Sequence, residues 1–378
     1  MNHFVTVALL LLSFSCTSVS QEKRDAAMSA SDTLSVHRLT LLFAGDLMQH
    51  QGQIDAARTS NGTFDYTDNF KLLKEEISQA DIAIGNLEVT LAGRPYSGYP
   101  AFSAPDEYLS AIQAAGFDVL ITANNHCLDR RKRGLERTIH LLDSLRIPTA
   151  GTYVNRDERN KRYPLLLEKN NFRIALLNYT YATNGIPVTA PNVVNYIDRT
   201  VMTKDIQAAK ALQPDAIIAC MHWGVEYQSL PNKEQKELAD WLLQQGVTHI
   251  IGSHPHVVQP MELRTDSLTG TQHVVVYSLG NFLSNMSARR TDGGLLFKLE
   301  LTKDSITRVG RSEYALVWTG RPKLTQKKNF TLYPIHASNF SLPAEARNRL
   351  GIFTKDARSL FLKQNKEIKE YLIPQKNE

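Results

Sequence analysis

The chain has 378 residues, of which 42% are hydrophobic and 21% are charged. This composition excludes disordered and fibrous proteins and fits one large globular domain with an appendage. Its 43 basic and 38 acidic residues give a formal net charge of +5 and are interspersed, so nothing indicates a nucleic-acid partner. The short basic run at 130–133 is better explained as a solvated loop or the start of a surface helix.

The N-terminus has the features of an export signal. Residues 4–14 (FVTVALLLLSF) form an apolar run that is too short to cross a bilayer but matches a signal-peptide core. Cys16 follows a small residue, as in a bacterial lipobox, where the cysteine becomes the lipidated first residue. No Lys or Arg precedes the core and Ser13 stands where Leu is usual, so ordinary cleavage after a small residue is the alternative. Both routes predict an extracytoplasmic protein, with a signal over 1–16 and a polar linker over 17–36 that lets the domain stand off a membrane.

From residue 38 onward, short apolar runs alternate with segments of helical periodicity, which predicts an α/β fold with strands buried on both faces. The runs predict strands of one large sheet system at 39–44, 81–85, 118–123, 172–178, 215–221, 248–252 and 273–279. Apolar residues three and four apart predict covering helices at 67–79, 105–115, 135–145, 203–212 and 233–245.

The alternation of strand-like and helix-like segments ends after residue 302. Two strand-like stretches, 305–309 and 311–318, lead into a polar loop and then an amphipathic helix pattern from 344 to about 371. We therefore predict a main domain over 37–302 and a C-terminal strand and helix extension over 303–378, a helical appendage to the main fold.

Polar side chains follow the predicted strands directly. They are Asp46 and His50, then Asn86 and Glu88, then Asn124, Asn125, His126 and Asp129, then His222, then His254 and His256, and finally Asn281. Because ligands bind at the carboxyl ends of strands in α/β sheets, these separated clusters are expected to form one site.

The residue types fit a metal pair. Two carboxylates, an amide oxygen and three imidazoles make a mixed oxygen and nitrogen ligand set that suits Mn, Fe or Zn and is too rich in nitrogen for calcium. Two divalent metals about 3.5–4 Å apart can activate water and clamp the oxygens of a displacement at phosphorus or a similar electrophile. His126 is the candidate general acid, with Asp129 close enough to orient its imidazole.

Six ordered motifs carry a family resemblance over residues 39–299: FAGDLM, IGNLE, ANNHCLDR, HWGVEY, GSHPHVVQ and YSLGNF. In order and spacing the chain resembles the poly-gamma-glutamate capsule synthesis (CapA) family, which is similar to the calcineurin-like metallophosphatases. The resemblance implies a metallophosphatase-like two-sheet β-sandwich flanked by helices.

The resemblance also implies which residues hold metal. The implied ligands are Asp46, Glu88, Asn125, His222, His254 and His256, with His50 as a weaker candidate. Two motifs depart from the metallophosphatase pattern: no histidine follows Asp46 until His50, and Gly85-Asn86-Leu87-Glu88 stands where Gly-Asp-x-x-Asp is usual. Metal binding is therefore a firmer expectation than any named reaction.

A second group of residues is expected to contact substrate: Asn86, Asn124, Glu226, Asn281 and Arg290. Arg289 and Arg290 suit an anionic ligand, an anionic polymer or a phosphate-containing small molecule, and surface exposure explains them equally well. Cys127 and Cys220 are expected to be buried small side chains, although a bridge between them stays open.

The sequence therefore favours an extracytoplasmic lipoprotein that acts in the synthesis, processing or anchoring of poly-gamma-glutamate or a similar envelope polymer, with a metal-dependent hydrolase-like site. Its expected partners are the polymer, the membrane through a lipid anchor, and the envelope synthesis machinery. A metal-dependent phosphoesterase of the periplasm or cell surface is one alternative, and a non-catalytic, polymer-binding scaffold is another.

Overall fold

The computed structural model describes Met1, residues 36–336 and residues 341–374. The predicted signal, Cys16 and residues 17–35 of the predicted linker lie outside the described residues. The remainder, His37–Glu378, forms one compact unit. Within the described residues, no helix combines the length and the apolar character needed to span a bilayer.

The first sheet has nine strands, with the order β16-β15-β14-β1-β2-β3-β4, while β13 pairs with β1 and β17 pairs with β15. Strands β1 to β4 are mutually parallel, whereas β14, β15 and β16 extend the sheet in antiparallel fashion from β1. The strands are β1 (His37–Leu47), β2 (Ile82–Leu87), β3 (Val119–Ile121), β4 (Thr149–Ala150), β13 (Asn281–Leu283), β14 (Gly293–Lys303), β15 (Thr307–Gly320), β16 (Thr331–Pro334) and β17 (Lys369–Glu370).

The second sheet has six strands in the order β11-β12-β10-β9-β7-β6. Its four central strands are parallel, and an antiparallel strand closes each edge. The strands are β6 (Leu165–Lys169), β7 (Phe172–Thr180), β9 (Ala216–His222), β10 (His249–Ser253), β11 (Met261–Thr265) and β12 (Gln272–Val276), and β5 (Thr152–Tyr153) pairs with β8 (Val193–Val194) in a small third sheet.

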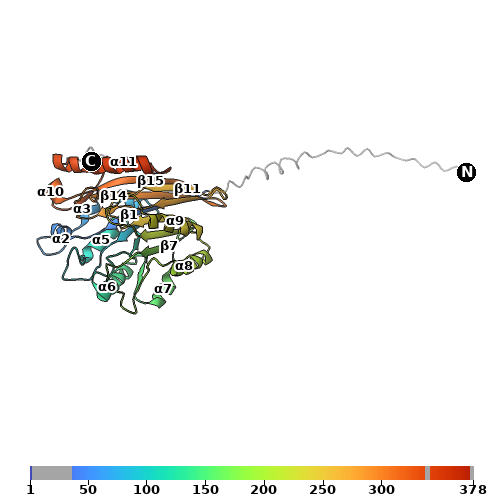
Figure 1. Cartoon of the computed structure of the whole chain (residues 1–378), viewed down its shortest axis with the longest axis horizontal. Helices are drawn as coiled ribbons and strands as arrows, with labels where there is room; N and C mark the ends of the chain where they lie inside the picture. Colours follow the sequence, from blue (N-terminus) through green and yellow to red (C-terminus); the bar gives the residue numbers. More distant parts are fainter. Residues whose placement is uncertain (2–35, 337–340, 375–378) are drawn as a thin grey trace. The chain divides into compact units, whose positions relative to one another are not determined.

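Apolar side chains fill the space between the two large sheets. Phe43 and Phe297 of the first sheet and Ile218 and Val276 of the second belong to one buried cluster. Separate clusters cover the outer faces, one beneath α5 (Asp106–Ala114) and its neighbours and one beneath α8 (Arg199–Ala211) and α9 (Lys233–Gln244). Helices therefore flank a two-sheet sandwich (Figure 1), which confirms the predicted α/β fold and divides the predicted single sheet system into two.

Most predicted helices are present. The helices are α2 (Gln51–Ala57), α3 (Thr67–Phe70), α4 (Lys74–Ser78), α5 (Asp106–Ala114), α6 (Arg131–Ser144), α7 (Arg156–Arg162), α8 (Arg199–Ala211), α9 (Lys233–Gln244), α10 (Pro322–Thr325) and α11 (Ala344–Gln364). The segment predicted as one helix over 67–79 is two short helices, and the buried Asn69 side chain at the end of the first donates to the Phe330 carbonyl at 2.7 Å. The basic run opens α6, as expected for the start of a surface helix.

The C-terminal segment is part of the first sheet. The two strand-like stretches form the single strand β15, which pairs along β14 from Gly293↔Trp318 to Lys303↔Thr307. Helix α11 packs Phe361 against Tyr314 of β15, with ring centroids 4.8 Å apart, and Figure 1 shows α11 lying along this sheet. The predicted helix ends at Gln364 rather than near 371, because residues 369–370 pair with β15 as β17.

Candidate metal centre

The site lies where parallel strands of both sheets end. In the first sheet Asp46 is in register with Asn86 of β2 and with Asn281 of β13. In the second sheet His222 ends β9 in register with Ser253, the last residue of β10. The two sheets therefore bring polar residues from distant parts of the chain to one edge, as the strand pattern predicts.

A close backbone crossing fixes the position of Asp46. A side chain at Gly45 would place its Cβ 2.0 Å from the Gly280 carbonyl oxygen, and Gly280 itself has φ +70°. Only glycine fits both requirements without strain. The crossing lets the Asp46 N–H donate to the Gly280 carbonyl at 3.0 Å, which places Asn281 beside Asp46.

The first cluster of possible metal ligands is Asp46, Glu88 and His222, all buried, with one ligand atom of each lying within 4.8 Å of the others. Asn86 donates to Asp46 Oδ1 at 2.8 Å and to Glu88 Oε2 at 3.3 Å. Burial, reinforced by the Asp46 carboxylate, raises the pKa of Glu88 well above its usual value. Burial also holds the pKa of His222 well below the ordinary value for histidine.

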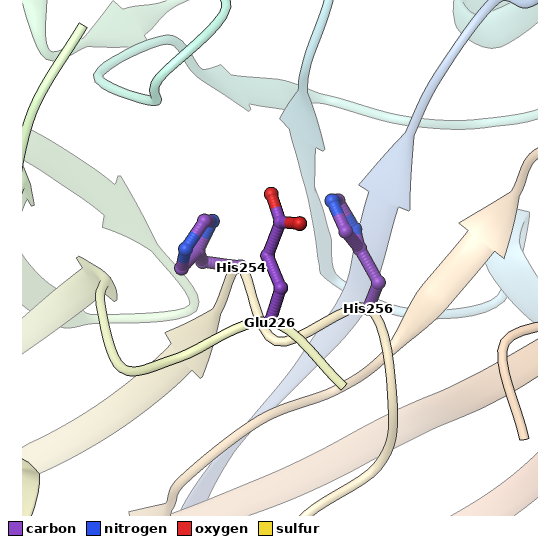
Figure 2. Close-up of side chains that lie close together, drawn as sticks. All are labelled: Glu226, His254 and His256. Atoms are coloured by element: carbon purple, nitrogen blue, oxygen red, sulfur yellow. The ribbon is translucent and has the colours of Figure 1, made fainter. Parts of the chain in front are cut away.

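The second cluster is Glu226, His254 and His256, whose ligand atoms meet the same distance limit of 4.8 Å. Figure 2 shows the Glu226 carboxylate pointing into the space between the two imidazoles. Both histidines have left-handed backbone, with φ +101° at His254 and +57° at His256. Burial lowers the pKa of His254 to about 3, so this imidazole is neutral at pH 7.

His256 joins the two clusters. Its Nδ1 lies 3.1 Å from Asp46 Oδ2 and 3.0 Å from Asn281 Oδ1. Its Nε2 lies 3.8 Å from Glu88 Oε1. The carboxylates of the first sheet and the imidazoles of the second therefore line one continuous polar space.

The residues fit a divalent metal. Glu88 Oε1 and His254 Nδ1 are buried and have no hydrogen-bond partner among the described residues. A buried carboxylate oxygen or imidazole nitrogen without a partner is costly, and a bound cation would remove that cost. Neutral imidazoles beside carboxylates are the donor set that transition metals prefer.

His126 and Asp129 form a buried pair beside the clusters. His126 Nδ1 lies 2.7 Å from Asp129 Oδ2, and the same oxygen accepts the Phe102 N–H at 2.8 Å. Burial raises the pKa of Asp129, which the His126 hydrogen bond partly offsets. The Phe102 ring lies 4.6 Å from the His126 ring, centroid to centroid, so the pair fixes the imidazole and leaves Nε2 as its free nitrogen.

Asn125 connects this pair to the metal clusters. Its Oδ1 lies 2.7 Å from His222 Nε2, and its Nδ2 donates to Asn184 Oδ1 at 3.1 Å. Asn184 Nδ2 lies 3.5 Å from His126 Nδ1. Asn184 was not predicted from the sequence, because it follows no strand end directly and lies in a loop after β7.

Three of the residues expected to contact substrate are buried and hydrogen-bonded to neighbours in the site: Asn86, Asn124 and Asn281. Asn124 donates to Asn86 Oδ1 at 3.2 Å and to the Leu87 carbonyl at 2.8 Å, while its own Oδ1 accepts the His126 N–H at 3.2 Å. Asn281 donates to the Thr291 carbonyl at 2.9 Å. These hydrogen bonds fix the positions of the groups around the metal clusters.

The structure places two expected residues away from both clusters. His50 precedes α2, where its Nδ1 accepts the Asn285 N–H at 3.3 Å and its ring meets Phe102 edge-on at 5.2 Å. Burial lowers the pKa of His50 to about 4. Arg290 donates to Ser229 Oγ at 3.3 Å and lies 3.7 Å from Asp356 of α11.

Arg289 also pairs with a residue of α11, because its Nε donates to Asp356 Oδ2 at 2.6 Å. Cys127 and Cys220 are both free and buried, as expected of small packed side chains. Burial holds the pKa of both thiols above the ordinary value, to about 12 at Cys127.

Comparison with known proteins gives matches over most of the chain. A relative in Bacillus anthracis, the capsule biosynthesis protein CapA, is 26% identical over 310 residues, covering 79% of this chain and 72% of the relative. The PGA biosynthesis protein CapA of Bacillus subtilis is 26% identical over 290 residues, covering 73% and 71%.

Among solved structures, the NAD nucleotidase of Haemophilus influenzae aligns with a TM-score of 0.48 and 12% identity, covering 86% of this chain and 68% of that one. The 5'-nucleotidase of Candida albicans aligns with a TM-score of 0.42 and 11% identity, covering 85% and 58%. Residues 40–286 match the family model described as bacterial capsule synthesis protein PGA_cap. The chain therefore belongs to this capsule synthesis family, as its motifs predict.

Proposed function

We propose that this protein is an extracytoplasmic, metal-dependent hydrolase that acts in the synthesis, processing or anchoring of poly-gamma-glutamate or a related envelope polymer. The observation that carries the proposal is the pair of buried, unpartnered ligand atoms, Glu88 Oε1 and His254 Nδ1, in a space lined by carboxylates and imidazoles. Family membership supports the polymer, because the matched relatives carry capsule and PGA biosynthesis in their names.

The protein's own residues supply the remaining parts of a hydrolytic site. Asp46, Glu88 and His222 would hold one divalent ion and Glu226, His254 and His256 a second. When bound, such ions supply Lewis acidity and lower the pKa of water.

His126 Nε2 donates the proton that the leaving atom needs, while Asp129 keeps the other ring nitrogen protonated and stabilises the charged imidazole. Asn124 and Asn125 hold His126 and His222 at fixed positions. The active unit therefore needs residues from both sheets.

Metal analysis of the purified, full-length protein tests the proposal. The protein is supplemented separately with Mn, Fe and Zn, and bound metal is measured after gel filtration. We expect at least one tightly bound divalent ion per chain and metal-dependent cleavage of poly-gamma-glutamate or a phosphate ester. A protein that retains none of the three metals would contradict the proposal and favour the non-catalytic scaffold.

A metal-dependent phosphoesterase is the second candidate, favoured by the His126–Asp129 pair at 2.7 Å. A positioned acid assists a poor leaving group such as an alkoxide. Phosphate release from simple esters, lost in His126→Asn with metal content unchanged, would favour the phosphoesterase. Cleavage of poly-gamma-glutamate without esterase activity would favour the polymer hydrolase.

We further propose a lipid anchor at Cys16, because the cysteine ends the apolar segment that predicts export. The anchor would hold the domain at the periplasmic or outer cell surface. Membrane fractionation of the parent protein and of Cys16→Ser tests this location. The variant should move from the membrane to the soluble extracytoplasmic fraction, and a parent protein that is already soluble would contradict the anchor.

A further inference from the structure

Three exposed tyrosines lie beside the metal centre. Tyr99, Tyr181 and Tyr227 are 74%, 44% and 51% exposed. Among the described residues, they are the only tyrosines in the set of large apolar side chains that are exposed. Each one lies beside a histidine of the site, so the three exposed rings are grouped around the centre rather than scattered over the surface.

The three rings approach three different histidines. The Tyr181 centroid lies 4.4 Å from that of His254, the Tyr227 centroid lies 6.3 Å from that of His256, and the Tyr99 centroid lies 6.4 Å from that of His126. They come from three separate loops, which follow β2, β7 and β9. A ligand that reaches the metal clusters and His126 therefore passes between aromatic faces.

Tyr227 keeps its place at a cost. Its backbone has φ +66°, a conformation that is strained for a bulky residue and that Gly or Asn adopts more easily. Its N–H donates to the Pro255 carbonyl at 2.8 Å, which ties it to the loop that carries both site histidines. Strain kept at a half-exposed aromatic residue points to a role for the ring in binding.

The ion pairs printed for the site carboxylates involve histidines. Within the described residues, Asp46 and Glu88 pair only with histidines, and Arg289 and Arg290 pair with Asp356 of α11. The side chains found beside the site histidines are instead the three tyrosine rings. Aromatic faces bind flat or apolar ring faces by stacking.

We propose that Tyr99, Tyr181 and Tyr227, the tyrosine rim, bind a ring carried by the substrate, a sugar or a nucleobase, next to the bond that is hydrolysed. This inference rests on the proposed function and narrows its substrate to a ring-bearing ester, such as a precursor or anchor of the polymer. Tyr181, which packs against His254, contributes most of the ring contact.

Calorimetric titration of the manganese-loaded, full-length protein tests the rim with three probes: inorganic phosphate, glucose 1-phosphate and adenosine monophosphate. We expect one ring-bearing probe to bind at least about tenfold tighter than phosphate, a ratio within the range of one stacked ring. Preference for the glucose ester identifies a sugar, and preference for the nucleotide identifies a base. Equal affinity for all three probes would overturn the proposal that the tyrosine rim binds a ring.

Variants separate ring contact from folding. Tyr181→Leu should weaken the preferred ring-bearing probe about tenfold and leave phosphate binding unchanged, whereas Leu268→Ala, in an exposed turn far along the chain, should change neither. Tyr227→Asn should keep or raise Tm, because Asn tolerates this backbone, and should still weaken the ring-bearing probe. Equal weakening of phosphate and of the ring-bearing probe in both tyrosine variants would overturn the proposal.

Metal content, measured before each titration, distinguishes the two possible failures. A protein that binds manganese and phosphate but shows no preference for rings contradicts the rim and leaves the proposed function standing. A protein that takes up no metal contradicts the proposed function itself, and the rim with it.

Discussion

The two halves of the centre are built by different means. In the first sheet Asp46 and Glu88 lie at the ends of adjacent parallel strands, where the pairing register shifts between Ala44 and Asp46, and the side chain of Asn86 donates to both carboxylates. In the second sheet His254 and His256 follow β10 on left-handed backbone. The first half places two carboxylates on backbone with negative φ, whereas the second places two imidazoles on left-handed backbone.

The two halves of the centre therefore lower the stability of the metal-free protein in different ways. Two buried carboxylates side by side are unfavourable until a cation joins them, so the first half depends on its ligand. The second half has its cost in the left-handed backbone and in one unpartnered imidazole nitrogen, so it depends less on a ligand than the first half does.

Glu88→Gln should have the largest effect. Removing the buried carboxylate should abolish binding at the first cluster and lower hydrolysis by more than about 10⁴-fold, beyond the 10²–10⁴ expected of acid catalysis alone. Without metal, the same substitution should stabilise the protein. Because folding raises the Glu88 pKa, the carboxyl group lowers the free energy of unfolding at pH 7. Scanning calorimetry in chelator should then show a Tm a few degrees above wild type, and a lower Tm would contradict the contrast.

His126→Asn should lower turnover by about 10²–10⁴ while leaving metal content unchanged, because His126 lies outside both ligand clusters. Asp129→Asn should act in the same direction through the orientation of the imidazole. Steady-state kinetics paired with metal analysis checks both variants. Loss of metal in His126→Asn would show that this histidine is a ligand rather than an acid.

Glu226→Gln should affect the second half alone. We expect bound metal to fall from about two ions per chain to about one, with little change in Tm, because Glu226 is only partly buried. Glu237→Gln, on the exposed face of α9, is the matched control and should retain the wild-type content. If Glu226→Gln keeps the wild-type metal content, Glu226 is not a ligand. That result would favour the substrate-contacting role predicted from the sequence.

Replacing His249 should have the smallest effect. This histidine is buried but lies outside both ligand clusters, so it reports the effect of burial alone. Burial lowers its pKa to about 3, and its Nδ1 accepts the Val274 N–H at 3.1 Å inside the second sheet. The unfolded state therefore binds more protons between about pH 6.5 and the folded pKa, so stability should fall as pH drops through this window, by at most about 1.4 kcal/mol per pH unit. Urea unfolding at pH 7 and pH 5 should show this loss in wild type and less of it in His249→Gln, and equal losses would contradict the assignment.

The sequence predicted the strand ends well, because parallel strands leave a recognisable pattern. The apolar runs at 39–44, 81–85, 215–221 and 248–252 correspond to β1, β2, β9 and β10. Because polar residues follow these runs directly, the convergence of Asp46, Glu88, His222 and His254 was predictable. The division of the strands between two sheets came from the family resemblance, since periodicity does not report which strands pair.

Other parts of the site could not be predicted, because they depend on packing between distant segments. The approach of Glu226 to His254 and His256 depends on left-handed backbone at both histidines, a conformation that is uncommon for residues other than glycine. The capture of His50 at the start of α2 depends on its contacts with Gln53 and Asn285. The pairing of residues 369–370 with β15 likewise depends on β15, a strand that the sequence predicted as two separate strands.

The most direct test of the metal centre is a crystal structure of the manganese-loaded protein with anomalous scattering data collected at the manganese edge. We predict two anomalous peaks, each within about 2.0–2.3 Å of its ligand atoms. One peak should lie among Asp46, Glu88 and His222, and the other among Glu226, His254 and His256. No anomalous peak at this edge of the two sheets, in crystals of protein shown to be folded and soaked in manganese, would contradict this prediction.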